Sequence, residues 1–221
     1  GGRFKYSQVI QLIDRVNNAI TSNITKVKIR RDLKVLINQF TQYELCFGNR
    51  FHINPEGFNI KSTGFTLAGS SDIVYFTDVP KTVVIIGDNG QLTTKLDTSK
   101  TDINGKVIYT GDLAVVKTTK TGEKQVVLKS AGTVNYSTGE IIINTLNIAS
   151  TVAKNDLIEI QAFPESNDVV GLKDLYLSFD ISKSKINMVK DVIASGEDIS
   201  GVTFIRDYYT SSYSNGEIER K

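Results

Sequence analysis

The clearest hydrophobic pattern in the chain predicts a β-hairpin at residues 132–144. Residues 133–136 alternate apolar and polar positions, residues 137–139 are typical of a turn, and three isoleucines follow at positions 141–143. Two runs of strand-forming residues separated by such a turn predict two antiparallel strands. The pattern describes architecture and carries no catalytic signature.

The beginning of the chain has a helical period instead. Ser7 is a favourable N-cap, and apolar residues follow it at helical spacing. We expect a helix over residues 7–20 that packs on a sheet. The residues expected to make this contact are Val9, Ile13, Val16 and Ile20.

After residue 23 the hydrophobic period changes from 3.6 to 2. Val27 and Ile29 alternate with Lys26, Lys28 and Arg30, which predicts a half-exposed strand. A second strand is expected to reach about Phe47, before the turn at residues 54–57. The other candidate strands are residues 58–62, 72–77, 82–86, 107–109, 113–117, 125–129, 141–144, 157–163 and 172–179.

Turn residues separate these strands at positions 87–90, 103–105, 119–123 and 137–139. Short strands at this spacing favour antiparallel sheets over parallel βα units. The predicted fold class is therefore α+β: mostly antiparallel, sandwich-like β structure with an N-terminal amphipathic helix packed on a sheet. Residues 183–195 have a mixed period, for which we favour a helix.

Three regions are expected along the chain. Residues 1–60 form a helix and strand region, residues 61–170 a β-rich domain, and residues 171–221 a strand or helix region with an aromatic and polar tail. The tail combines tyrosines with hydroxyl residues and few aliphatic ones, so it has no core of its own. The start, Gly1-Gly2-Arg3, suggests a fragment of a longer polypeptide.

The amino-acid composition disfavours an enzyme. The 221 residues include one histidine, one cysteine and no tryptophan, so the commonest catalytic and metal-ligating groups are scarce. A single cysteine forms no internal disulfide. No apolar run reaches the ~18 residues of a membrane span, and a net charge of +2 gives no broad surface for nucleic acid. We expect a non-enzymatic protein without cofactor, metal, nucleic acid or membrane partner.

The remaining candidates for chemistry are weak. Cys46 and His52 lack the further donors of a zinc site, although they could form a nucleophilic pair. Residues 102–105 begin like a calcium loop but lack its later ligands. Residues 87–90 lack the lysine of a phosphate-binding loop. Basic residues between Lys26 and Lys34 could bind phosphate, but are more typical of a solvated face or a charge-paired interface. Nothing places the carboxylates Glu197 and Asp198 across a cleft.

Two segments carry a resemblance to a known family. Residues 4–13, FKYSQVIQLI, resemble the late part of the baseplate J-like module of contractile-tailed phages. Residues 20–60, from ITSNITKVKIRRDLKV to NPEGFNI, resemble the carboxyl-terminal region of the T-even baseplate wedge proteins that form the inter-wedge ring. The resemblance covers most of the chain, without a short catalytic motif.

The resemblance implies a structural virion protein of the tail baseplate, assembled in the host cytoplasm. Its partners would be a second copy of itself, as a homodimer within a larger ring, and other baseplate wedge proteins. The ring would join wedges around the hub and rearrange when the sheath contracts.

A competing class is a carbohydrate-binding or adhesin β module. In that case exposed tyrosines would stack on sugars, the candidates being Tyr43, Tyr75, Tyr109, Tyr136 and Tyr176. A carboxylate enzyme is a third possibility. For self-association, the first candidate surface is the aromatic tail, through Phe204, Tyr208, Tyr209 and Tyr213. The alternative is that these tyrosines cover the domain's own sheet.

Overall fold

The computed structural model describes residues 3–17, 20, 23, 25–87, 90–171, 213–214 and 217–218. The chain divides into two compact units, each considered by itself. The first contains Gly1–Ile10 and Ile24–Leu177, and the second contains Gln11–Asn23 and Ser178–Lys221. In the described part of the second unit, β14 (Tyr213–Ser214) and β15 (Glu217–Ile218) pair as a short antiparallel hairpin.

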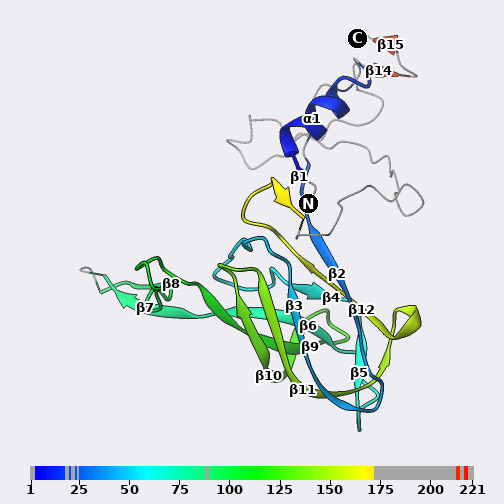
Figure 1. Cartoon of the computed structure of the whole chain (residues 1–221), viewed down its shortest axis with the longest axis vertical. Helices are drawn as coiled ribbons and strands as arrows, with labels where there is room; N and C mark the ends of the chain where they lie inside the picture. Colours follow the sequence, from blue (N-terminus) through cyan, green and yellow to red (C-terminus); the bar gives the residue numbers. More distant parts are fainter. Residues whose placement is uncertain are drawn as a thin grey trace. The chain divides into compact units, whose positions relative to one another are not determined.

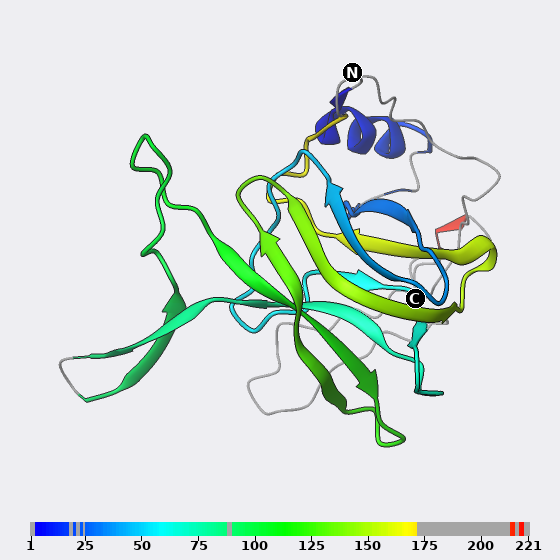
Figure 2. The ribbon, with the colours of Figure 1, turned by 60° about the horizontal axis from the view of Figure 1, so that its bottom comes forward.

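A nine-stranded antiparallel sheet forms the body of the first unit and curls into a nearly closed barrel (Figures 1 and 2). The strand order is β2-β12-β4-β6-β9-β10-β11-β3, and β5 pairs with β11. The strands are β2 (Ile29–Lys34), β3 (Phe40–Cys46), β4 (Lys61–Ser62), β5 (Phe65–Leu67), β6 (Tyr75–Pro80), β9 (Thr110–Thr118), β10 (Lys124–Asn135), β11 (Glu140–Thr151) and β12 (Leu157–Ala162).

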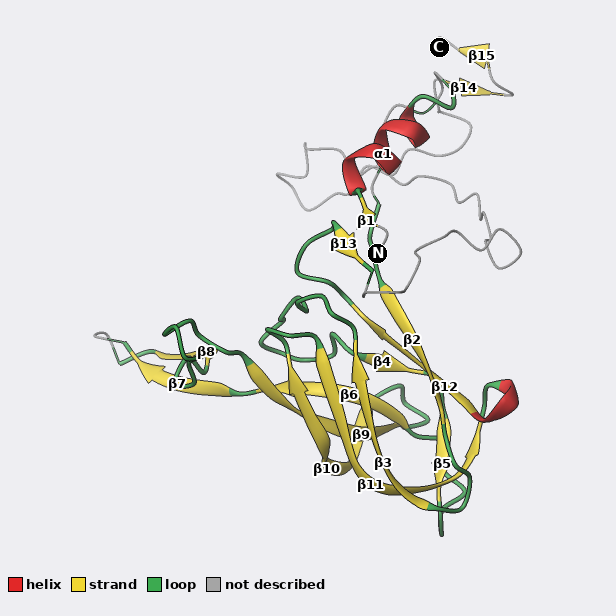
Figure 3. Cartoon of the chain, in the orientation of Figure 1, coloured by secondary structure: helices red, strands yellow, loops and turns green. Residues whose placement is uncertain are grey.

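Shorter elements complete the described chain (Figure 3). Strand β1 (Arg3–Phe4) pairs with β13 (Val169–Val170), and β7 (Thr82–Ile86) pairs with β8 (Leu92–Leu96). The helical elements are α1 (Tyr6–Asp14) and a 3-10 turn, η1 (Lys154–Asp156).

The hairpin expected at residues 132–144 is confirmed and forms part of the nine-stranded sheet. It joins β10 to β11, with Thr133 opposite Ile142 and Val134 opposite Ile141. Gly139 ends the turn at a φ of 73°, a conformation that glycine adopts without strain. A Cβ at this position would collide with the carbonyl oxygen of Asn49, so the turn also packs closely on a neighbouring segment.

The core fills the barrel and draws on most of its strands. Its largest fully buried side chains include Phe51, Phe65, Phe76, Ile141 and Ile160. Alternation along β12 is typical: Ile158, Ile160 and Ala162 are buried while the residues between them are partly exposed. The ends of the strand order, β2 and β3, are not paired with each other. Leu36 lies in the segment that connects them, and its backbone N–H donates a 2.9 Å hydrogen bond to the Tyr43 hydroxyl.

The helix differs from the expectation. It ends at Asp14 rather than near residue 20, and none of its residues is buried. Ile13, expected in a helix–sheet contact, is 37% exposed, and Val16 lies beyond the helix end and is also exposed. Helical spacing predicted the element correctly, but it carries no information on whether another element covers the apolar face.

Two further expectations change for a related reason. The sheet is one curled barrel rather than a two-sheet sandwich, because bulges in the β9–β10 and β11–β3 ladders bend and twist long strands. The sheet also crosses the boundary expected between residues 60 and 61, since β2 pairs with β12 and β3 with β11. The helix expected at 183–195 and the strand at 172–179 lie outside the described residues.

Candidate functional site

Residues 81–110 form an excursion from the barrel, which we call the arm (Figure 2). It starts where β6 ends and returns where β9 begins, and the Lys81 N–H donates a 3.0 Å hydrogen bond to the Thr110 carbonyl at its base. The β7–β8 hairpin forms one part, and the bridge between Thr101 and Val107 closes a second loop. None of the described arm residues is buried.

Aliphatic side chains of β7 lie on both faces of the arm's hairpin. Directly opposed residues of an antiparallel pair share a face, so Val84, Ile86 and Leu92 lie together. They are 63%, 71% and 67% exposed. Val83 and Ile85 lie on the other face and are exposed as well. An isolated two-stranded hairpin is marginally stable in water, so this exposed apolar surface makes the hairpin a candidate contact surface.

Among the described residues, no strand pairs with the outer edge of β7. The Gly87 N–H donates a hydrogen bond to the Gln91 carbonyl, and the Asp97 N–H to the Lys81 carbonyl. These two bonds show which residues of β7 direct their backbone N–H and C=O groups toward β8. Residues 83 and 85 therefore bond to β8, while the backbone groups of Thr82, Val84 and Ile86 point away from it. Natural edge strands are protected by lysine, proline or bulges. Strand β7, Thr-Val-Val-Ile-Ile, has none of these.

A buried polar cluster around Asp78 is the second candidate. Asp78 is only 1% exposed, and its carboxylate accepts three hydrogen bonds. Its Oδ2 accepts from Asn59 Nδ2 and from the Tyr136 hydroxyl, both at 2.8 Å, and its Oδ1 accepts from the Ile60 N–H at 2.7 Å. Burial, followed by the adjacent carboxylate, raises the pKa of Tyr136 well above its usual range.

This cluster is structural in character. Its three donors are neutral groups that hold the carboxylate in place, and the residue is closed to solvent. It ties the segment before β4, strand β6 and the β10–β11 turn together. Asp78 lies two positions after the buried Phe76, so both side chains lie on the inward face of β6. This spacing could have identified Asp78 as a buried carboxylate, and we did not predict it.

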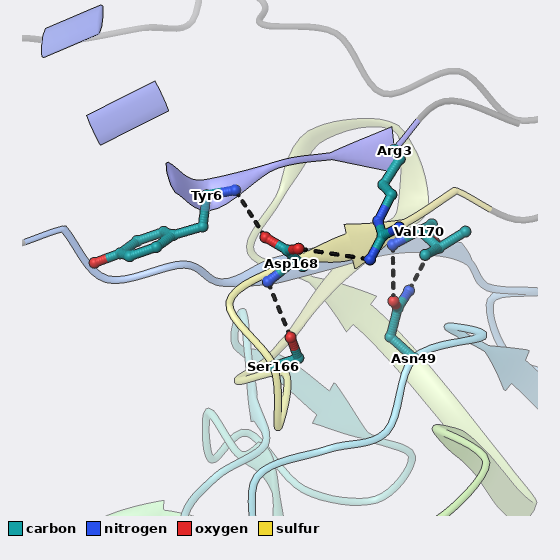
Figure 4. A network of polar contacts seen from close by, with 6 residues as sticks. All are labelled: Arg3, Tyr6, Asn49, Ser166, Asp168 and Val170. Carbon is teal, nitrogen blue, oxygen red and sulfur yellow. Dashed lines mark hydrogen bonds and ion pairs between the residues drawn. The ribbon is translucent and has the colours of Figure 1, made fainter. Parts of the chain in front are cut away.

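A group of polar contacts, which we call the clasp, links Arg3 and Tyr6 to Asp168, and Asn49 to Val170 (Figure 4). The side chain of Asn49 pairs with the backbone of Val170, donating to its carbonyl at 2.9 Å and accepting from its N–H at 3.0 Å. Asp168 accepts a 2.9 Å hydrogen bond from the Tyr6 N–H at the start of α1 and forms a 3.6 Å ion pair with Arg3. A carboxylate at a helix N-terminus is electrostatically favourable.

Cys46 and His52 show no catalytic arrangement. Cys46 is a half-buried free thiol in β3, and His52 is exposed, with its backbone N–H bonded to the Phe163 carbonyl. Among the described residues, no group of three or more histidine, cysteine or acidic side chains is placed to hold a metal ion. Residues 102–106 form a turn in which the Asp102 carboxylate accepts from the Asn104 and Lys106 backbone.

The basic run and the tyrosines are partly engaged elsewhere. Arg30 forms ion pairs with Asp32 and Glu159 at 2.9 and 3.2 Å, and the Lys28 ammonium lies 5.1 Å from the centre of the Phe163 ring. Tyr136, a candidate sugar platform, is buried, and Tyr43, Tyr75 and Tyr109 are half-buried. The tail candidates Phe204, Tyr208 and Tyr209 and the platform candidate Tyr176 lie outside the described residues, and only the backbone of Tyr213 is described.

One hollow of about 240 Å³ lies at the base of the arm. Lys81 and Lys100 line it together with Asn135 and Glu140. This volume is below the roughly 300–1,000 Å³ of typical small-molecule sites, and the Lys81 ammonium already lies 4.0 Å from the Asp112 carboxylate. The arm is therefore the stronger candidate site.

Comparison with known proteins adds no relative. No protein family, curated protein or solved structure matches the chain. In the described part of the chain, no helix has the length and apolar character that crossing a bilayer requires.

Proposed function

We propose that this chain is a structural subunit of a phage tail baseplate wedge, without enzymatic activity or cofactor. In this role it self-associates, joins wedges into a ring around the hub together with other wedge proteins, and rearranges when the sheath contracts. It is incorporated into the virion after assembly in the host cytoplasm. The sequence resemblance suggests the assembly, and the exposed arm supports self-association.

The observation that carries this proposal is an ordered arm without a core. Fixing each residue of a chain costs about 1–2 kcal/mol of backbone entropy, and burial of apolar area normally offsets that cost. None of the described residues of the arm is fully buried within the chain, and its hairpin presents five exposed aliphatic residues of β7 and β8. Contact with another protein molecule would supply the missing burial.

The test measures mass in solution by sedimentation equilibrium over a range of concentrations. In one variant, Asn-Gly replaces residues 82–96 and joins Lys81 to Asp97, which face each other through a 2.9 Å hydrogen bond. Since none of the described residues removed is buried, its thermal unfolding should match that of the parent chain. We expect the parent to sediment at a multiple of 24.4 kDa and the variant at the mass of one chain.

Ile103→Ser is the matched control. Ile103 is fully exposed at the tip of the second loop, outside the hairpin, so this variant should associate like the parent. A parent chain that stays monomeric at all concentrations would refute self-association. A shortened variant that associates as well as the parent would show that the hairpin is not the contact.

A further inference from the structure

One face of the arm's hairpin is small compared with a stable protein interface. The β7–β8 hairpin is about 17 Å long and two strands wide, so one of its faces covers on the order of 200 Å². A stable interface buries about 800 Å² on each partner. Face-to-face stacking of two arms is therefore too small on its own, and the backbone edge of β7 is the further surface that the arm offers.

Within the described part of the chain, a second strand edge without a pairing strand lies in the first half of β10. Strand β11 pairs with β10 only over Gly132–Asn135, which leaves the preceding residues bonded on one side only, to β9. The Thr119 N–H donates a hydrogen bond to the Glu123 carbonyl. Because hydrogen-bonded and non-hydrogen-bonded pairs alternate along antiparallel strands, the backbone groups of Lys124 and Val126 point away from β9.

The side chains along this edge match β7 in character. Val126, Val127 and Leu128 are exposed aliphatic residues. Lys124, which would otherwise protect the edge, turns toward the ring of Phe58, with its Nζ 3.6 Å from the ring centre. Burial and the nearby Lys61 cation lower the pKa of Lys124. An uncharged β7 can approach such an edge, whereas β8 carries Lys95.

The arm cannot reach this edge within its own chain. It leaves the barrel at the Thr110 end of β9, while the free part of β10 pairs with the opposite end, at Val116–Thr118. These ends are about 20 Å apart along the strand, and the arm and the β9–β10 tip extend in different directions (Figure 2). A strand from a second molecule is required.

We propose that β7 of one copy adds as a strand to the free edge of β10 of a second copy, over Lys124–Leu128. This inference rests on the proposed self-association and names its donor and acceptor surfaces. Main-chain hydrogen bonds supply the pairing, and the aliphatic residues on both strands supply the apolar contact. Reciprocal exchange between two copies gives a closed dimer, and one-way donation gives a ring.

Cross-linking between two chains tests this pairing directly. Two full-length chains, both with Cys46→Ser, are co-expressed with different tags, one carrying Val84→Cys and the other Val126→Cys. A short bismaleimide should then give a covalent dimer with both tags. Replacing Val84→Cys by Ile103→Cys is the control and should abolish that product.

Each outcome has a definite meaning. Chains that remain monomeric refute the proposed function and the pairing together. Chains that associate without the mixed product refute the pairing alone. A product formed between two Val84→Cys chains would show arm-to-arm packing instead and would also refute the pairing.

A backbone variant provides a second test that does not depend on cross-linking. Val84→Pro removes an N–H that points to the free edge and leaves the β7–β8 ladder intact, since proline is tolerated at such edge positions. Thr94→Pro does the same on the outer edge of β8 and is the matched control. We expect loss of association only for Val84→Pro. Equal behaviour of the two variants would overturn the assignment of β7 as donor.

Discussion

Replacing Tyr136 by phenylalanine isolates one hydrogen bond of the buried cluster. Tyr136 is 1% exposed, and its hydroxyl donates to Asp78 Oδ2 at 2.8 Å. Phenylalanine fills nearly the same volume, while Asp78 keeps its bonds from Asn59 and Ile60. A hydrogen bond to a charged group contributes about 1.5–3 kcal/mol, so the free energy of unfolding near neutral pH should fall by that amount.

The raised pKa of Tyr136 also predicts how the stability of the protein changes with pH. The pKa of Tyr136 is raised in the folded state, and in the unfolded chain it is about 10. Its contribution to stability is therefore present below pH 10 and is lost progressively as the pH rises above 10, at about 1.4 kcal/mol per pH unit. The Tyr136→Phe chain lacks this group, so the difference in stability between the two proteins should narrow above pH 10.

Urea unfolding followed by circular dichroism, in steps from pH 7 to 11, measures both effects. Tyr75→Phe, in the strand that carries Asp78, is the control, because the structure gives its hydroxyl no hydrogen bond within the described residues. The other tyrosines are common to both proteins and cancel in the difference. A loss below about 0.5 kcal/mol at pH 7, or a difference that stays constant up to pH 11, would refute the role given to the Tyr136–Asp78 bond.

Two further predictions concern the clasp and the helix. Asn49→Ala removes the side-chain hydrogen bonds to Val170 and Phe47 and should lower the free energy of unfolding by about 1–2 kcal/mol. Unchanged amide exchange at Val170 would contradict this reading. Ile13→Ala should lower the free energy of unfolding by less than about 1 kcal/mol, because α1 buries none of its residues. Ile141→Ala, in the core, should lower it by about 2–5 kcal/mol. Similar losses for the two variants in chemical denaturation would show that Ile13 packs in a core, as the sequence predicted.

The sequence predicted local elements well where the pattern was local. The strand at residues 82–86 matches β7 to the residue, and the hairpin at 132–144 joins β10 to β11 as expected. In both cases β-branched residues and turn residues determine the conformation within a few positions of the chain.

The sequence could not give the features that depend on distant partners. The pairing of β2 with β12 joins residues more than a hundred positions apart, and no periodicity encodes it. Strand β8, Leu-Thr-Thr-Lys-Leu, lacked a strong alternating signal and was missed. The aliphatic run of β7 would suit a buried strand, and only the structure reveals that nothing in the described chain covers it. Asp78 was missed because a buried carboxylate depends on donors from two other segments.

The most direct test of the central claim is NMR-detected hydrogen exchange of the arm amides at increasing protein concentration. The amides of Val84 and Ile86 point to the free edge of β7, whereas those of Val83 and Ile85 bond to β8 and serve as internal references. We predict that exchange at Val84 and Ile86 slows in step with the increase in sedimenting mass. Unchanged exchange at these two amides, at a concentration where the chain is associated, would contradict the claim that another copy covers the arm.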